Sequence, residues 1–380
     1  MLLPHYPWPS HSNRAHPPDE GCSDYIIDIR LRVNMEDVLT GFDLTVGSGD
    51  AGISLHHPVI ASPMAGVFDP PYRRILHDLG IELSYTEMIS SRGIYEGSGK
   101  TEEIAGWIPE IGCSAAQIFG SEPVYLSHAA KEMERMGHHM IDINAGCPKR
   151  KVLVQGSGGA LIRTPERLLA CLGAVLDSVR IPVSIKIRSG YHTFEKGPFL
   201  DLVKDISSIG VSCIALHPRT VAQGFRGSAE RGLIDEVSSL VDVPVIASGD
   251  VRERSDVVDY LRRGARAVMV GRALMGDPLR VKRLINGGTH DPLSTVEGIR
   301  EHLKRAREHL VHSVNHYGER RGCVRFRSHL GWYTARFPGR KRIRDRIFHV
   351  SSTDETMDLI DNIEREWTSI PSTGNIKYSR

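Results

Sequence analysis

The sequence contains one cysteine in a setting that suits acid chemistry. Cys147 lies in the segment 144–148, which reads NAGCP, and a flexible glycine-rich stretch follows at 155–159. A cysteine between glycine and proline in an exposed loop is not typical of a hydrophobic core, and a thiol with an ordinary pKa of about 8.5 is mostly protonated at neutral pH. Such a thiol can donate a proton to a carbanion-like carbon, so we interpret Cys147 as a general acid.

The other cysteines are interpreted as structural. Cys113, Cys171 and Cys213 stand at predicted strand or helix positions, where a small apolar side chain is usually buried. Cys22 and Cys323 complete the set, and no two of the six form a C-x-x-C pair. This spacing argues against a disulfide framework and against a zinc site, so the sequence predicts no metal.

Further residues that could bind or react stand where short apolar runs rich in Val and Ile end. If these runs are parallel strands of one barrel, their carboxyl ends meet at one mouth, where the active sites of such barrels lie. One polar residue at a strand end is weak evidence, but a series of eight such ends predicts a site. The series comprises Pro63 and Met64, Glu87 and Met88, Gln117, Asn144 with Cys147, Lys186 with Arg188, His217 with Arg219, Ser248 with Gly249 and Asp250, and Gly271 with Arg272.

Two of these strand ends have the composition of a phosphate site. The segments 248–251 (SGDV) and 270–273 (VGRA) contain glycines that let backbone N–H groups approach an anion, and Arg272 can pair with it. Without an anion, Arg272 would be a charge at the barrel mouth that lacks a partner. Loops after the seventh and eighth strands are the usual phosphate site of these barrels.

Across the mouth from these loops, Lys186 and Gln117 could hold a flat heterocycle. An amide both donates and accepts hydrogen bonds, and an ammonium stabilises an anionic reduced ring. Flavin mononucleotide (FMN) fits this description. A pyridoxal phosphate enzyme also uses a barrel lysine, as a Schiff base, but the residues around Lys186 do not indicate that use.

The elements that must position these residues alternate between strand and helix patterns, as in βαβ units. Glycines that suit helix C-caps precede several strands, at 80, 137, 210 and 264, and Thr164 with Pro165 marks one helix start. Eight strands with crossovers favour an α/β fold of the (β/α)8 TIM-barrel type over an open doubly wound sheet. The predicted strands are 58–62, 81–86, 114–119, 140–144, 183–188, 213–217, 245–248 and 267–270.

The chain length of 380 residues allows for a barrel of about 250 residues and a smaller domain. Residues 1–55, rich in Pro, His, Ser and Gly, predict a poorly ordered arm with one short helix near Met35, which could be the true start. We assign the barrel to residues 56–290, a helical domain to 291–370, and a tail to 371–380. The helical pattern runs from about 294 to 367 and breaks at 337–339.

Charge is distributed unevenly along the chain. Between Arg300 and Arg346, 14 Lys or Arg stand against 4 acids, a net of +10, although the whole chain has a formal net charge of only +2. This basic segment indicates a polyanionic partner. The sequence contains no run of eighteen apolar residues and no signal-peptide pattern, so we expect a cytoplasmic protein that does not bind a membrane. We also expect it to be a monomer.

At these residues the sequence resembles the tRNA-dihydrouridine synthase family, from about Val59 to Ile347. The matching segments are 61–67 (ASPMAGV), 86–88 (TEM), 117–120 (QIFG), 143–148 (INAGCP), 186–188 (KIR), 217–220 (HPRT), 249–250 and 271–272. The segments 326–333 (FRSHLGWY) and 337–339 (FPG) are similar to the bacterial subfamily that acts in the D-loop. Ser248, Pro218 and Arg231 depart from the family pattern, which more often has an asparagine, a glycine and an aromatic residue there.

The resemblance implies an FMN cofactor reduced by NADPH, hydride transfer to C6 of uracil, and protonation of C5 by Cys147. The partner would be tRNA, whose uridine must be flipped out of the folded RNA to reach a barrel. The implied cofactor-binding residues are Pro63, Met64, Gln117, Lys186, His217, Ser248, Gly249, Asp250, Gly271 and Arg272. The predicted substrate-binding residues are Asn144, Arg188 and Arg219 at the mouth, and Arg325, Arg327, Arg340, Lys341, Arg342 and Arg344 in the basic segment.

Two other readings remain open on the sequence. Another flavin barrel, of the dihydroorotate dehydrogenase or ene-reductase type, would share the phosphate loops and a loop cysteine but would not need the basic helical domain. A catalytically silent RNA-binding protein would keep the basic domain, but nothing in its function would require Cys147 and Lys186 at strand ends.

Overall fold

The computed structural model describes residue 39, residues 41–288 and residues 291–369. Three sequence-based expectations lie outside these residues: the short helix near Met35, the start at Met35, and the tail at 371–380. Cys22 also lies outside them. All of the described residues belong to one compact unit, which contains every element described below.

Eight parallel strands form a closed barrel, as predicted. Neighbouring strands are hydrogen bonded in sequence order, and pairings of β4 with β6 and of β11 with β3 close the ring. A short extra strand, β5 (Ile89–Ser90), pairs with the end of β6 and was not predicted. The barrel strands are β3 (Val59–Ala61), β4 (Leu83–Tyr85), β6 (Cys113–Phe119), β7 (Met140–Ala145), β8 (Val183–Arg188), β9 (Cys213–His217), β10 (Val245–Ser248) and β11 (Ala267–Val270).

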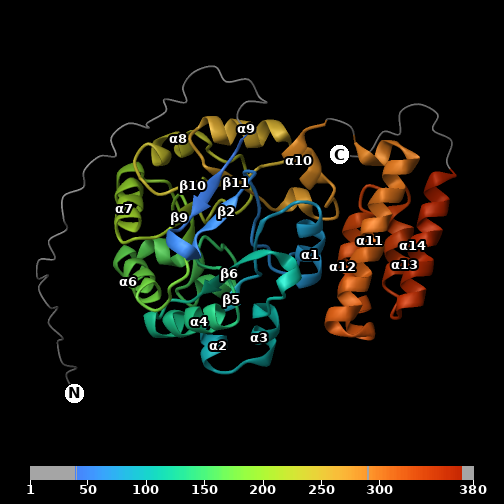
Figure 1. Cartoon of the computed structure of the whole chain (residues 1–380), viewed down its shortest axis with the longest axis horizontal. Coiled ribbons are helices and arrows are strands. Elements are labelled where there is room, and N and C mark those ends of the chain that lie inside the picture. The colour runs from blue at the N-terminus through green and yellow to red at the C-terminus, as the bar shows by residue number, and fades with distance from the viewer. Residues whose placement is uncertain (1–38, 40, 289–290, 370–380) are drawn as a thin grey trace, which may run out of the picture. The chain divides into compact units, whose positions relative to one another are not determined.

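Helices surround these strands in the crossover connections (Figure 1). Thr164 is the N-cap residue of α6, with Pro165 in its first turn, and the four predicted C-cap glycines all have positive φ. The α-helices are α1 (Pro70–Asp78), α2 (Ser91–Tyr95), α3 (Gly99–Ala105), α4 (Pro123–Arg135), α5 (Arg150–Leu153), α6 (Pro165–Leu176), α7 (Lys196–Ser208), α8 (Gly232–Ser238), α9 (Arg254–Arg262) and α10 (Arg280–Asn286). Short 3-10 helices are η2 (Pro109–Ile111), η3 (Gly158–Arg163) and η4 (Arg272–Leu274).

A two-stranded antiparallel sheet precedes the barrel. It is made of β1 (Leu44–Val46) and β2 (Ile53–Leu55), with η1 (Gly49–Ala51) between them. The apolar side chains of both strands are buried in one cluster with inward-facing barrel residues such as Ile60 and Met269. The predicted poorly ordered arm is therefore wrong for residues 44–55, because alternate residues there bury an apolar face against the barrel interior.

Alternation along each strand divides the barrel residues into two sets. In β7, for example, Ile141 and Ile143 belong to the core between strands and helices, whereas Met140 belongs to the inner cluster. Since successive side chains of a strand point to opposite faces, Asp142 and Asn144 share the inward face with Met140. The inward face thus changes from apolar to polar toward the carboxyl end of the strand.

The C-terminal region is helical, as predicted. Four helices, α11 (Val296–Tyr317), α12 (Glu319–Tyr333), α13 (Arg340–Ile347) and α14 (Thr353–Thr368), follow η5 (Pro292–Ser294), and α11 to α14 lie together in Figure 1. Ser352 and Glu355 form a capping box that fixes the start of α14. The break expected at 337–339 separates α12 from α13. Among the described residues no helix is both long and apolar enough to cross a membrane.

Candidate active site at the barrel mouth

A cavity of about 590 Å³ lies at the carboxyl ends of the strands. This volume lies within the range of roughly 300–1,000 Å³ that is usual for ligand pockets. All ten residues predicted to bind a cofactor line it, together with Cys147, Asn144 and Arg188. Residues of the helical region, among them Trp332, Tyr333 and Arg336, line the same cavity. Sequence reasoning did not anticipate that contribution, because no local pattern indicates which helix meets the barrel mouth.

Strand register explains why the polar residues meet. In the parallel pairing of β7 with β8, Asn144 stands opposite Lys186, and in that of β8 with β9, Arg188 stands opposite His217. Gln117 of β6 pairs in the same way with Asp142 of β7. Because inward positions recur every second residue, these side chains form neighbouring layers at one end of the barrel.

A chain of hydrogen bonds runs from the barrel interior to the cysteine loop. Ser184 Oγ and Gln117 Nε2 donate to the buried carboxylate of Asp142, at 2.6 Å and 2.7 Å. Asn144 Nδ2 donates to Gln117 Oε1 at 2.8 Å, and Asn144 Oδ1 accepts the N–H of Cys147 at 2.9 Å. The loop that carries the thiol is therefore held through side chains of three adjacent strands.

Asp142 does not line the cavity but holds Gln117, which does, and the sequence analysis missed this contact. Burial raises the pKa of Asp142 to about 6, while the hydrogen bonds from Ser184 and Gln117 lower it. A signal was present, since Asp142 stands two residues before Asn144 and so shares its face of the strand. A carboxylate in the middle of a strand that otherwise contains only apolar residues and Asn144 could have identified it.

Cys147 is less exposed than predicted. Only 9% of the residue is accessible, and its carbonyl accepts the N–H of Gly159 at 3.1 Å. A Cβ atom at Gly158 would come within 2.7 Å of Val152 and 3.1 Å of Cys147 Cβ. The loop is therefore closely packed. We predicted an exposed cysteine followed by a flexible glycine stretch, whereas the cysteine is buried and the glycines pack against it. Burial raises the pKa of the thiol, and a backbone hydrogen bond from Lys149 opposes the rise.

Burial lowers the pKa of both Lys186 and His217 and so favours their neutral forms. Burial, with a smaller contribution from Arg188, lowers the pKa of Lys186 to about 8. Burial and the nearby cations Lys186, Arg188 and Arg219 hold the pKa of His217 far below its usual range, so its imidazole is neutral. Arg219 Nη1 lies 3.2 Å from His217 Nε2, which can accept that hydrogen bond. The cavity thus offers one titratable cation beside one neutral imidazole.

The two loops predicted to bind phosphate lie together, but one premise of that prediction is wrong. Arg272 has a partner, because Nη2 donates to Asp250 Oδ1 at 3.1 Å, and its guanidinium lies 4.6 Å from the centre of the Phe225 ring. Burial acts to raise the pKa of Asp250, but Arg219, the Ala229 N–H and Arg272 together lower it. Asp250 has the left-handed φ of 50°, which is uncommon outside glycine.

Arg219 and Arg327 are placed differently from their predicted role in substrate binding. Arg219 is 1% exposed and donates to Asp250 and to the carbonyls of Gly227 and Arg226. Arg327 donates through Nε and Nη2 to the carbonyl of Val350, at 2.8 Å and 2.6 Å. Both guanidiniums hold backbone in place, so the prediction is corrected for these two residues. Residue type alone did not reveal their burial.

Arg188 lines the cavity and also braces the cysteine loop. It donates to the carbonyls of Gly146, Thr220 and Gly224 at 2.9 Å, 3.0 Å and 2.8 Å. Burial lowers its pKa to about 10. Arg231, at a position where the family more often has an aromatic residue, forms ion pairs with Asp256 and Asp259 behind the loop of Asp250.

The basic segment of the helical region is largely neutralised by acids from other parts of the chain. Eight of its fourteen cations pair with a carboxylate: Arg300, Arg305, Arg307, Arg321, Arg325, Arg336, Arg342 and Arg346. Across residues 291–369 the sequence holds 15 Lys or Arg and 12 Asp or Glu, a net of only +3. The count of +10 ended before the acidic helix α14 and so overstated the local charge.

Six cations of that segment make no ion pair with any described residue: Arg327, which donates to a backbone carbonyl, and Lys304, Arg320, Arg340, Lys341 and Arg344. Three of them lie on α13, where Arg340 and Arg344 are one turn apart. Arg342 and Arg346, also one turn apart, pair with Glu366 of α14. The helix therefore has one face of paired arginines and another of cations that remain available to a partner.

Comparisons with known proteins identify the family of the chain. Residues 59–368 match the family described as "Dihydrouridine synthase (Dus)". The chain is 31% identical over 327 residues to a probable tRNA-dihydrouridine synthase of Rickettsia conorii, covering 86% of this chain and 98% of the relative. It is 33% identical over 311 residues to tRNA-dihydrouridine synthase B of Xanthomonas axonopodis pv. citri, covering 80% and 92%.

Among solved structures, histamine dehydrogenase from Rhizobium sp. 4-9 is similar in fold. The TM-score is 0.53 at 11% sequence identity, and the match covers 89% of this chain and 65% of that chain. At this identity the similarity supports the barrel fold alone.

Proposed function

Since the chain belongs to the dihydrouridine synthase family of flavin-dependent oxidoreductases, we propose that it reduces the C5=C6 bond of specific uridines in tRNA, with FMN as cofactor and NADPH as reductant. The observation that carries this proposal is the convergence of Cys147, Asn144, Lys186 and His217 on one cavity at the barrel mouth. A protonated thiol can donate a proton, and an ammonium can stabilise an anionic reduced ring, so the cavity contains groups for both parts of the reaction.

The polar groups that line the cavity suit the ring and the phosphate of FMN. Within the described chain the ammonium of Lys186 makes no hydrogen bond or ion pair, so it is available to a flavin ring. Gly249 has φ of 116°, and a Cβ atom would come 2.8 Å from His217 there and 2.9 Å from Met64 Sδ at Gly271, so both loops exclude a side chain at these positions. The first N–H groups of η4 have no acceptor within that helix and suit a phosphate.

The proposed roles follow from these positions. Lys186, Gln117 and His217 would hold the ring, and Gly249, Gly271 and Arg272 would hold the phosphate. When bound, FMN would supply the hydride that C6 of the uracil accepts. Cys147 would donate its Sγ proton to C5, which completes the addition of H⁻ and H⁺ across the double bond. Asn144 positions the thiol through the N–H of Cys147.

The proposed substrate accounts for the second region of the chain. A uridine inside folded RNA must be flipped out to reach the barrel mouth, which requires contacts to the RNA on either side of it. The exposed Lys149, Arg150 and Lys151 begin two residues after the cysteine, and the unpaired cations of α13 lie on the helical region. A flavin barrel that reduces a small molecule would have no use for these cations, so they favour tRNA over the other flavin-barrel reactions.

Expression of the chain in a bacterial strain that lacks its own dihydrouridine synthases tests the proposal. We expect dihydrouridine to appear in tRNA by mass spectrometry, and the purified protein to be yellow and to oxidise NADPH. Sequencing of the modified tRNA would give the position. A strain that gains no dihydrouridine, although the flavin-loaded protein is present, would contradict the proposed activity.

A further inference from the structure

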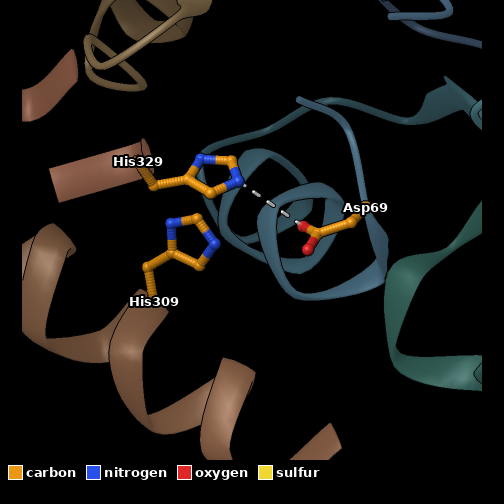
Figure 2. Close-up of side chains that lie close together, drawn as sticks. All are labelled: Asp69, His309 and His329. Carbon is orange, nitrogen blue, oxygen red and sulfur yellow. Dashed lines mark ion pairs between the residues drawn. The ribbon is translucent and has the colours of Figure 1, made fainter. Parts of the chain in front are cut away.

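Three buried side chains far from each other in sequence meet where helices α11 and α12 pack against α1. Asp69 precedes α1, His309 lies on α11 and His329 on α12 (Figure 2). One ligand atom from each, a carboxylate oxygen and two ring nitrogens, lie within 4.8 Å of one another. None of the three residues lines the cavity at the barrel mouth.

The two imidazoles lack the partners that buried polar groups normally have. His309 is 0% exposed, and neither ring nitrogen has a hydrogen-bond partner among the described residues. His329 is 4% exposed, and its Nδ1 likewise has none in that part of the chain. A buried polar atom left unsatisfied costs about 1–3 kcal/mol, and an ion bound by one nitrogen of each ring would supply His309 with the partner that it lacks.

The donor atoms of the cluster suit a cation. Each neutral imidazole presents one nitrogen lone pair, and Asp69 brings carboxylate oxygens. Aromatic rings enclose the group, with Tyr72 stacked 5.0 Å and Phe326 5.1 Å from the ring of His309.

We propose that Asp69, His309 and His329 bind one divalent transition-metal ion, for which Zn²⁺ is the best match. Neutral imidazole and carboxylate are ligands that zinc takes in tetrahedral sites, with bonds of about 2.0–2.2 Å. The edge of such a tetrahedron is roughly 3.3 Å. His329 Nε2 lies 3.9 Å from a carboxylate oxygen of Asp69, so closure requires only small side-chain adjustments.

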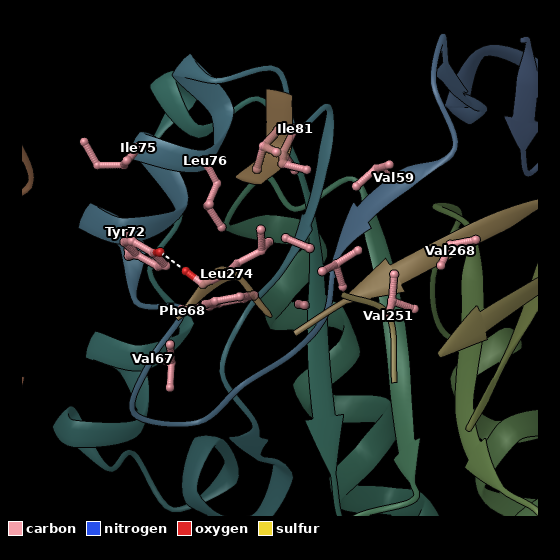
Figure 3. Close-up of a cluster of buried hydrophobic side chains, with 14 of the residues drawn as sticks. Val59, Val67, Phe68, Tyr72, Ile75, Leu76, Ile81, Val251, Val268 and Leu274 are labelled. Carbon is pink, nitrogen blue, oxygen red and sulfur yellow. Dashed lines mark hydrogen bonds between the residues drawn. The ribbon is translucent and has the colours of Figure 1, made fainter. Parts of the chain in front are cut away.

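The surroundings of Asp69 support a ligand role. The N–H of Tyr72 donates to Oδ1 at 3.2 Å and the Tyr317 hydroxyl donates to Oδ2 at 3.1 Å, which orients the carboxylate. Ligating carboxylates are commonly held by such outer hydrogen bonds. Helix α1 is itself anchored in the core by Phe68, Ile75 and Leu76, and the Tyr72 hydroxyl donates to the carbonyl of Leu274 (Figure 3).

The site would tie the helical region to the barrel. Its ligands come from one barrel crossover and two C-terminal helices, so a bound ion would stabilise the packing of α11 and α12 on α1. The sequence analysis predicted no metal because it searched for closely spaced cysteines. Here the first ligand is separated from the other two by more than 200 residues.

Metal content of the full-length protein tests the proposal. We expect protein produced in zinc-supplemented medium to carry about one zinc per chain by elemental mass spectrometry, and cobalt-substituted protein to show visible d–d absorption of a four-coordinate site. His309→Phe and His329→Phe should each lose the ion. His302→Gln is the matched control, since His302 is a buried α11 histidine outside the cluster and should leave the metal content unchanged.

Wild-type protein that contains no zinc, and that gains neither zinc nor cobalt after refolding with either ion, would overturn the proposal whatever the variants do. Retention of the ion by both phenylalanine variants would place it elsewhere and would also overturn it. Folding of each variant is checked by circular dichroism. Chelation of the ion should lower the melting temperature of the wild type and leave that of His329→Phe unchanged, which separates a ligand role from packing alone.

Discussion

The barrel mouth and the basic segment of the helical region both contain many polar and charged side chains, but their pairing differs. At the mouth, Lys186 has no hydrogen bond or ion pair within the described chain, and its pKa falls to about 8. In the helical region, Arg307 pairs with Asp361 and Glu364, which raise its pKa although partial burial opposes this. The number of charges in a region therefore says less about ligands than the number that the protein itself leaves unpaired.

The proposed acid at the mouth and the carboxylates of the helical region also differ in whether the protein itself already pairs them. Cys147 is held by backbone hydrogen bonds, while its Sγ remains at the wall of a cavity. By contrast, Asp361, Glu364 and Glu366 of α14 are paired with arginines, among them Arg307 and Arg342. We expect substitutions at the mouth to affect chemistry and substitutions of paired arginines to affect stability, and the following predictions test that division.

The largest effect is expected from Cys147→Ala. General acid catalysis contributes typically about 10²–10⁴-fold, so dihydrouridine formation should fall by that factor while flavin content and NADPH oxidation persist. Single-turnover reduction of tRNA measures it. Cys113→Ala, which alters a half-buried cysteine at the start of β6, serves as the control. Near-normal product from the Cys147 variant would show that another group supplies the proton.

The pH dependence of the same step follows from the raised pKa of Cys147. An acid must be protonated to act, and burial keeps this thiol protonated beyond the ordinary pKa of about 8.5. Product formation at saturating flavin should therefore be maintained through pH 7 to 8 and decline only at higher pH. A decline that begins well below pH 8 would indicate a thiolate with a lowered pKa, contrary to the burial of the loop.

A smaller effect is expected from Asn144→Ala. The substitution removes the oxygen that accepts the N–H of Cys147 and of Gly146, and the amide that donates to Gln117. Loss of such buried partners costs about 1–3 kcal/mol, so turnover should fall roughly 5- to 150-fold. Ser184→Ala, at the opposite end of the same hydrogen-bond chain, should have the weaker effect. If both variants lost the same activity, the series of hydrogen bonds from Ser184 to Asn144 would act as one structural unit and would not specifically position the thiol.

Lys186 should make flavin binding depend on pH. Its pKa in the folded chain, about 8, lies below the ordinary value of about 10.4, so the ammonium is present below pH 8 and lost above it. FMN affinity should therefore be constant below pH 8 and fall by up to about tenfold per pH unit above it. In Lys186→Met the affinity should be lower and this step absent. Titration of apoprotein with FMN from pH 6 to 10 measures both, and an identical pH profile in the variant would contradict the role.

The residues at the mouth were predictable because they depend only on the alternation of side chains along a strand and on the parallel order of the strands. A period of two along each strand, with all strands parallel, places Gln117, Lys186 and His217 at one end of the barrel from sequence alone. The hairpin at 44–55 was missed because its strands are only three residues long and are separated by glycines. Such short strands carry too little periodicity to identify.

The pairing of charges could not be predicted in this way. Arg307 meets Asp361 across 54 residues, and Arg321 meets Glu103 across 218 residues. Only the packing of the helices determines these contacts, which leave no spacing pattern in the sequence. For the same reason, the burial of Arg219 and Arg327 was not visible, and both were assigned to the substrate when they in fact hold backbone carbonyls.

The smallest effect distinguishes the two faces of α13. Arg344 is exposed and makes no ion pair within the described chain, whereas Arg342, on the same helix, pairs with Glu366. If tRNA is held through its phosphates, Arg344→Ala should remove one contact, reduce the slope of log K against log salt by up to about 0.9, and weaken binding roughly fivefold at 0.15 M salt.

Arg342→Ala should change the slope less, because the free protein already holds that guanidinium on a carboxylate, and the variant instead leaves Glu366 with only Arg346. Filter binding of tRNA at five salt concentrations gives both slopes, with flavin content as the check that the barrel is intact. If the two variants have equal slopes, the protein's own ion pairs do not decide which arginines meet the RNA. The cations close to Cys147 at 149–151 would then be the better candidates, since all three are exposed and Lys149 lines the cavity itself.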